Sequence, residues 1–143
     1  MATKKKIHKL EFSFENDFAL VGIASHENDY RLSWAINKSL DLGFVKTDDL
    51  AVDHPKHKIT INYSMYNYDD ANNYVNYSLI SNKSDKGFLL PEMKNIDFIL
   101  RISGTPDTNL VNNILTKLKK IDIVITAFLI EDITDRLSKI FIL

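Results

Sequence analysis

The sequence contains no cysteine, and glycine and proline are scarce. Without thiols the chain cannot form a disulfide framework, a cysteine nucleophile or a metal site with cysteine ligands. Its 4 glycines and 3 prolines among 143 residues leave little material for flexible linkers. We therefore expect a single domain over residues 1–143, and no motif along it predicts a cofactor or a metal ion.

Long hydrophobic runs and an excess of one charge sign are also missing. The most apolar segment, residues 121–130, is shorter than the ~20 residues of a membrane helix and contains Asp122. Acidic residues interrupt the region where a signal peptide would have its apolar stretch. The 18 Lys and Arg nearly balance the 19 Asp and Glu, so no broad field attracts nucleic acid or anionic lipid. These features predict a cytoplasmic protein with no membrane partner, and they argue against nucleic acid.

The first third of the chain predicts a strand followed by a helix. Residues 18–24 form a nearly continuous apolar run of strand length. Asn28 is placed to cap the next helix, and Gly43 is placed to end it in a left-handed conformation. The apolar face of this helix consists of Leu32, Ala35, Ile36 and Leu40. The polar residues 47–58 predict a loop.

The remainder predicts a hairpin, further strands and a second helix. Apolar and polar residues alternate over residues 59–66, and an Asp- and Asn-rich turn at 69–73 leads to a return strand at 74–81. Thr105, followed by Pro106, predicts the start of an amphipathic helix. The other expected elements are strands at 96–102 and 121–130 and a last short helix after Asp132.

This order of elements predicts the α+β class. It is close to a ferredoxin-like (split βαβ) arrangement or a related one, with two helices on one face of a mainly antiparallel sheet.

Residues 90–98, with the sequence Leu-Pro-Glu-Met-Lys-Asn-Ile-Asp-Phe, resemble the signature of the bacterial IPExxxVDY family. Pro91, Glu92 and Asp97 match it identically, while Leu90, Ile96 and Phe98 are conservative departures. Residues 17–40 are also similar to the start of that family. The resemblance implies a small bacterial protein and carries no catalytic assignment. Because Phe98 stands where the family has Tyr, a hydroxyl at this position is dispensable here.

Glu92 and Asp97 are candidate functional carboxylates. Held close together, and helped by His26, they could serve as the acid and base of a small hydrolase or lyase, or hold a hard cation. The structural alternative is favoured, because Pro91-Glu92 is a common start of a helical turn and Asp97 can cap a neighbouring one. Spacing alone does not bring the two carboxylates together.

The segment from Asp53 to His57 places two imidazoles and a carboxylate near one another. His and Asp are zinc ligands, but no fourth ligand lies nearby in the sequence. We therefore interpret this segment as a solvated loop.

Five of the six tyrosines lie between residues 63 and 77. Tyr63, Tyr66 and Tyr74 are the candidate binding residues among them. Aromatic side chains on a hairpin can stack on nucleic-acid bases, but Asp69 and Asp70 would repel phosphate. Cross-strand packing is favoured, followed by a protein-binding or self-association surface.

The sequence as a whole predicts a non-enzymatic binding or regulatory module that self-associates, as a homodimer, through a sheet edge or the hairpin. It does not identify the protein partner. The two alternatives are the small hydrolase or lyase and a nucleic-acid-binding module that uses the Tyr-rich hairpin.

Overall fold

The structure is a computed structural model that describes residues 18–54, 58–104 and 106–141. Within these ranges the chain forms ten strands, three α-helices and one short 3-10 helix. The expectation of a mixed α and β protein is therefore confirmed. None of the helices in the described ranges has the length and apolar composition needed to cross a bilayer.

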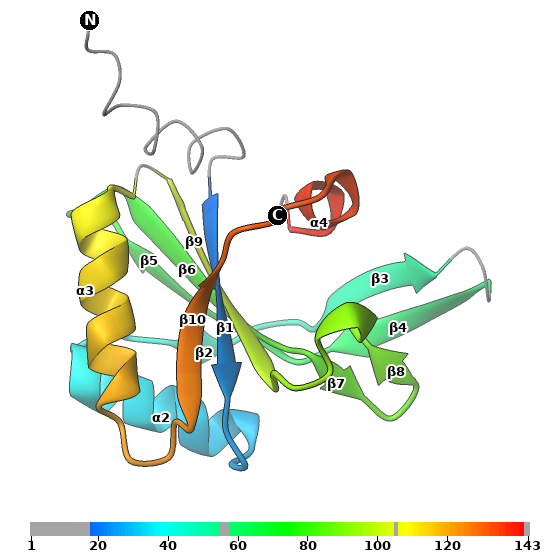
Figure 1. Cartoon of the computed structure of the whole chain (residues 1–143), viewed down its shortest axis with the longest axis horizontal. Coiled ribbons are helices and arrows are strands. Elements are labelled where there is room, and N and C mark those ends of the chain that lie inside the picture. Colours follow the sequence, from blue (N-terminus) through cyan, green and yellow to red (C-terminus); the bar gives the residue numbers. More distant parts are fainter. Residues whose placement is uncertain (1–17, 55–57, 105, 142–143) are drawn as a thin grey trace, which may run out of the picture.

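Six strands form the main sheet, and each pairs with its neighbours in antiparallel fashion (Figure 1). From one edge to the other the order is β10 (Thr126–Ile130), β1 (Phe18–Ala24), β9 (Phe98–Gly104), β6 (Val75–Ser81), β5 (Met65–Asp70) and β2 (Val45–Lys46). The five-residue strand β10 and the two-residue strand β2 are therefore the two edges.

The smaller elements lie away from the two long helices, on the right of Figure 1 and at its upper centre. They are the hairpin of β3 (Leu50–His54) and β4 (Ile59–Tyr63), the short pair β7 (Lys83–Ser84) and β8 (Gly87–Phe88), the 3-10 helix η1 (Pro91–Met93) and α4 (Asp135–Ile140). The expected loop at 47–58 was wrong, because β3 runs through it.

The first long helix, α2 (Asp29–Leu40), starts where the sequence predicts and ends earlier. The side chain of Asn28 accepts a hydrogen bond from the Arg31 backbone N–H at 2.9 Å, which confirms the predicted cap. The helix ends at Asp41, whose φ of 58° is left-handed, and not at Gly43. Asp takes this conformation more readily than most residues.

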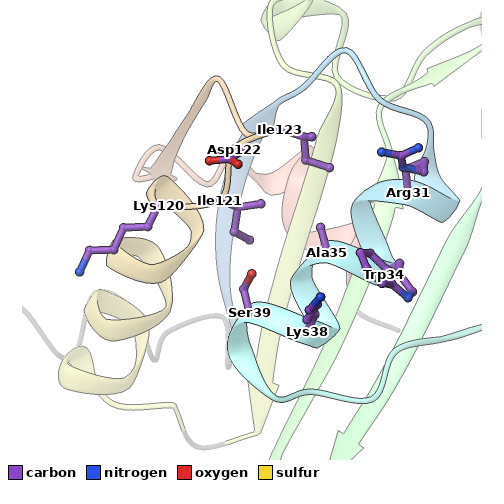
Figure 2. A pocket seen from close by; sticks show the side chains of 9 residues that line it. All are labelled: Arg31, Trp34, Ala35, Lys38, Ser39, Lys120, Ile121, Asp122 and Ile123. Atoms are coloured by element: carbon purple, nitrogen blue, oxygen red, sulfur yellow. The ribbon is translucent and has the colours of Figure 1, made fainter.

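The second long helix, α3 (Thr108–Lys119), is capped by Asp107, which accepts from the Leu110 N–H at 2.7 Å. The cap expected from the sequence, Thr105, lies outside the described residues. After α3 the chain turns beside α2 at residues 121–123 (Figure 2), so the strand expected to begin at 121 begins only at Thr126.

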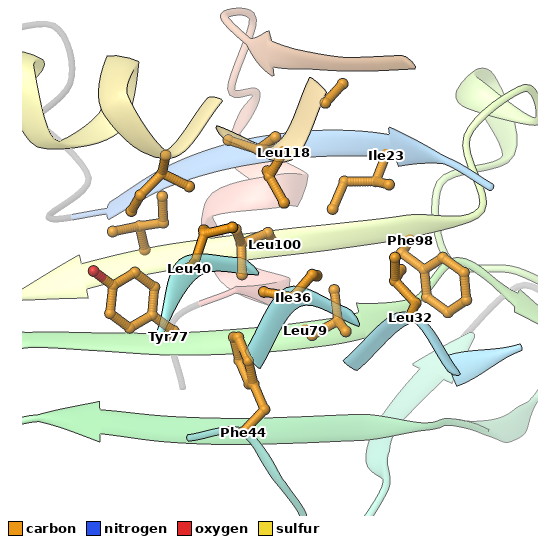
Figure 3. Close-up of a cluster of buried hydrophobic side chains, with 14 of the residues drawn as sticks. Ile23, Leu32, Ile36, Leu40, Phe44, Tyr77, Leu79, Phe98, Leu100 and Leu118 are labelled. Atoms are coloured by element: carbon orange, nitrogen blue, oxygen red, sulfur yellow. The ribbon is translucent and has the colours of Figure 1, made fainter. Parts of the chain in front are cut away.

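The sheet separates two hydrophobic cores. Alternate residues of β1 point to opposite faces, so Val21 and Ile23 enter the first core while Leu20 enters the second. The first core lies under α2 and α3 and includes Leu32, Ile36, Leu40, Leu79, Leu100 and Leu118 (Figure 3). The second joins the other face to the small elements through Ile61, Tyr63, Ile80, Leu90, Ile96, Ile99, Leu137 and Phe141.

The expected ferredoxin-like arrangement, with two helices on one face of the sheet, was wrong. The main sheet has six strands, and two further two-stranded sheets accompany it. A third helix, α4, contributes Leu137 to the core on the opposite face. The sequence analysis did not anticipate this second core, because its cover comes from short elements far apart in the chain, such as β4, η1 and α4.

Candidate functional site

The segment that resembles the family signature is organised around Asn82, which follows β6 and is fully buried. Its side-chain Nδ2 donates to the carbonyl oxygens of Met93, at 3.1 Å, and Ile96, at 2.9 Å. Its Oδ1 accepts from the backbone N–H of Leu90 at 2.7 Å. One amide side chain therefore fixes the loop before and after η1.

Asp97 joins the end of β1 to the start of β9. Its Oδ2 accepts from the Ser25 backbone N–H at 2.8 Å, and its Oδ1 lies 2.5 Å from the Lys83 Nζ. Its own N–H donates to the carbonyl of Ile23 at 2.8 Å. Both carboxylate oxygens are therefore engaged within the protein, as expected of a structural group.

Pro91 and Glu92 begin η1 on the surface. Pro91 occupies the first turn, where its missing N–H costs no hydrogen bond, and Glu92 is exposed. The Glu92 Oε2 lies 3.5 Å from the Arg136 Nη1, a distance and exposure at which an ion pair contributes little to stability. The other guanidinium nitrogen of Arg136 donates to the Leu89 carbonyl at 2.8 Å.

A surface hollow of about 330 Å³ lies beside Asp97. It is lined by Ser25, His26, Glu27, Ser81, Lys83, Asp97 and Phe98. The structure thus brings His26 and Asp97 to one hollow, while Glu92 does not line it. This hollow therefore does not bring Glu92 and Asp97 together as an acid and base pair.

Two of the three candidate tyrosines lie in the cores. Tyr63 is fully buried, with its hydroxyl 3.4 Å from the His54 Nε2, and Tyr66 is buried on the opposite face of the main sheet. Burial raises the pKa of both hydroxyls. Neither ring is available to stack on a ligand at the surface.

Tyr77 and Tyr68 pack in the same core as Tyr66. Their rings stack with centroids 5.9 Å apart, and the ring of Phe44 meets Tyr77 edge-on at 6.3 Å. Burial, followed by the charge of Asp70, raises the pKa of Tyr77 to about 12. The Tyr-rich hairpin therefore directs most of its rings into the protein.

Tyr74 differs from these tyrosines, because 77% of its surface is exposed at the tip of the β5–β6 hairpin. Its φ of 58° is left-handed, a conformation that costs a residue with a side chain about 1–2 kcal/mol. Gly104 permits this turn. A Cβ on Gly104 would lie 2.2 Å from the Tyr74 carbonyl oxygen, and the φ of Gly104 is +102°.

The structure describes two of the three residues considered for zinc. Asp53 and His54 lie on β3, where Asp53 accepts from the Thr60 hydroxyl at 2.7 Å, and His57 lies outside the described residues. The described ranges contain no group of three or more His, Cys, Asp or Glu side chains that could hold a metal ion.

Two surface features were missed in the sequence analysis. The first is the edge strand β10 with the residue before it, a run from 125 to 130 with no charged side chain. The second is the outer side of α2, which carries the exposed rings of Tyr30 and Trp34. The two rings are four residues apart, and this spacing places them on the same face of a helix. The sequence analysis considered only the apolar inner face of this helix.

No protein-family model matches this chain, and a search of curated proteins finds no match.

Proposed function

We propose that this chain is a non-enzymatic binding module that self-associates through the edge of β10. The observation that supports the proposal is an edge strand with no charged residue from 125 to 130, bounded by Asp122 and Glu131. Ile125, directly before the strand, is 60% exposed.

An edge strand has a row of backbone N–H and C=O groups that no neighbour satisfies. Proteins that stay monomeric usually block such edges with charges, prolines, bulges or very short strands. The opposite edge of the sheet is blocked in two of these ways, since β2 is only two residues long and one of them is Lys46. The β10 edge meets none of these conditions within residues 125–130, so it is the better site for pairing.

A second copy of β10 is the simplest occupant. Two identical strands can pair in antiparallel fashion about a two-fold axis, so that each copy contributes the same residues. Such a pair would continue the main sheet from one protomer into the other. Ala127 and Ile130 enter the two cores from β10, so both faces of the strand contribute to packing, and among the described residues no strand pairs with its outer edge.

We further propose that the chain is a bacterial protein of the IPExxxVDY type that works in the cytoplasm. The support is the likeness of residues 90–98 to the signature, together with a structural use for its residues. Asp97 holds two neighbouring elements together, and Pro91 starts η1. On this proposal the residues of the signature stabilise the conformation of the loop around η1.

Sedimentation analysis over a range of protein concentrations tests the self-association. We expect the native chain to form a dimer, and we expect a double variant with Ile125→Lys and Thr126→Lys to be monomeric. Both side chains are exposed, so the lysines charge the edge without entering either core.

The matched control is Val45→Lys, which adds a lysine to an exposed position on the other edge. It should leave the dimer intact. A native chain that stays monomeric at about 1 mM would overturn the proposal, as would a dimer that persists in the double variant.

A further inference from the structure

The outer side of α2 exposes two large aromatic rings one helical turn apart. Tyr30 is 65% exposed and Trp34 is 55% exposed, whereas the inner side buries Leu32, Ile36 and Leu40. Large apolar side chains on the surface often mark an interaction site when they occur together. Trp and Tyr are also among the residues enriched where proteins bind one another.

Beside Trp34 the surface forms an open hollow of about 270 Å³ between α2 and the turn that follows α3 (Figure 2). Ala35, Ile121 and Ile123 supply its aliphatic part, and Trp34 lies at its α2 side. The hollow is open and shallow, so it suits one apolar side chain of an extended segment better than an enclosed small molecule.

Three cations surround this hollow. Arg31 and Lys38 belong to α2 and Lys120 follows α3, while Asp122 is the acid that lines the hollow. Lys38 lies over the Trp34 ring, with its Nζ 5.1 Å from the ring centroid. None of the ion pairs formed within the described ranges involves any of these three cations.

We propose that this surface binds an acidic peptide segment of a partner protein. An aliphatic side chain of the segment would enter the hollow against Trp34, and carboxylates on either side of it would meet Arg31 and Lys38. An aromatic anchor surrounded by cations is complementary to this combination. The proposal does not depend on the pairing of β10.

The same features favour a peptide over a nucleic acid. A single-strand site stacks successive bases on a series of rings along a basic groove. Here one ring lines the hollow, the rest of the floor is aliphatic, and the whole chain has a net charge of −1. Nucleic acid is therefore the alternative that the experiment has to exclude.

Trp34 allows binding to be measured directly, because it is the single tryptophan of the chain. The probes are synthetic peptides without aromatic residues, each with one leucine or isoleucine among glutamates and aspartates. We expect acidic peptides to move the tryptophan emission to shorter wavelength as the indole leaves water. Peptides with lysine in place of the acids should leave the emission unchanged, and added salt should weaken the binding.

Charge reversal tests which cations are responsible. The double variant Arg31→Glu, Lys38→Glu should lose at least about tenfold in affinity for the acidic peptides. The matched control is Lys58→Glu, Lys86→Glu, which makes the same change in net charge at two exposed positions outside the hollow. It should bind within about twofold of the native chain.

Three results would overturn the proposal. The first is an emission that no acidic peptide shifts at up to about 1 mM and low salt. The second is an equal loss of affinity in the control variant, since binding would then follow net charge alone. The third is an oligothymidine that binds more tightly than every acidic peptide, which would assign the surface to nucleic acid.

Discussion

At the scale of single residues, the amide of Asn82 matches the hydrogen-bonding groups of the loop around η1. The loop around η1 presents two carbonyls and one N–H to the same point, and the Asn amide offers two donors and an acceptor. A carboxylate would place its oxygens against the carbonyls of Met93 and Ile96. A leucine would satisfy none of the three groups.

We predict that Asn82→Ala lowers the free energy of unfolding by about 2–4 kcal/mol, because it leaves buried backbone groups without partners. Chemical denaturation measures the change. The control is Asn72→Ala, an exposed Asn in the hairpin turn, which should stay within about 0.5 kcal/mol of the native chain. If both substitutions cost the same, the loop does not depend on the Asn82 amide.

At the scale of elements, α4 depends on tertiary contacts for its existence. Six residues are too few for an isolated helix in water. Leu137 and Phe141 anchor it in the second core, and the Arg101 Nε donates to the Phe141 carbonyl at 2.5 Å. Burial lowers the pKa of Arg101, whose guanidinium lies over the ring of Phe18.

We predict that Leu137→Ala costs about 2–4 kcal/mol of stability and loosens α4 before the rest of the protein. Hydrogen exchange at the Phe141 amide, which donates to the Leu137 carbonyl, should become faster. The control is Leu115→Ala at a half-buried position on α3, which should leave that exchange rate unchanged. Unchanged exchange in Leu137→Ala would show that α4 does not depend on this anchor.

Elements with strong local signals could be predicted from the sequence. The apolar run of β1 and the cap of α2 at Asn28 were confirmed, since each depends on neighbouring residues. β3 was missed because its side chains are half-buried or exposed, so the strand lacks a continuous apolar run. The end of α2 was placed at Gly43 because glycine is the commoner left-handed residue, and Asp41 took that conformation instead.

The candidate site was harder to predict than the elements. The sequence singled out Glu92 and Asp97 and favoured structural roles for them, but it did not identify the partners of either carboxylate, because Glu92 lies in η1 and Asp97 directly before β9. Asp97 meets residues 14 and 72 positions away, and such contacts leave no local pattern. The role of Asn82 was missed for the same reason, because its partners lie on the far side of the loop.

At the scale of the whole molecule, one sheet is covered on both faces, and tyrosines are buried on each side of it. Tyr63 lies in the second core, and Tyr66 and Tyr77 lie in the first. Burial raises the pKa of all three hydroxyls, and that of Tyr77 to about 12. In the unfolded chain a tyrosine ionises near its ordinary value of about 10.

These shifts predict that the molecule loses stability as the pH rises above about 10. Below that pH the hydroxyls are protonated in both states and add no pH dependence. Between about 10 and 12 the unfolded chain releases protons that the folded chain retains, so unfolding becomes progressively more favourable.

In Tyr77→Phe the loss of stability at high pH should be smaller, because the phenylalanine has no proton to release. Urea denaturation at several pH values from 8 upward measures both slopes, and the values at pH 8 separate any packing effect of the lost hydroxyl. Equal slopes in the two proteins would show that the ionisation of Tyr77 is not linked to folding.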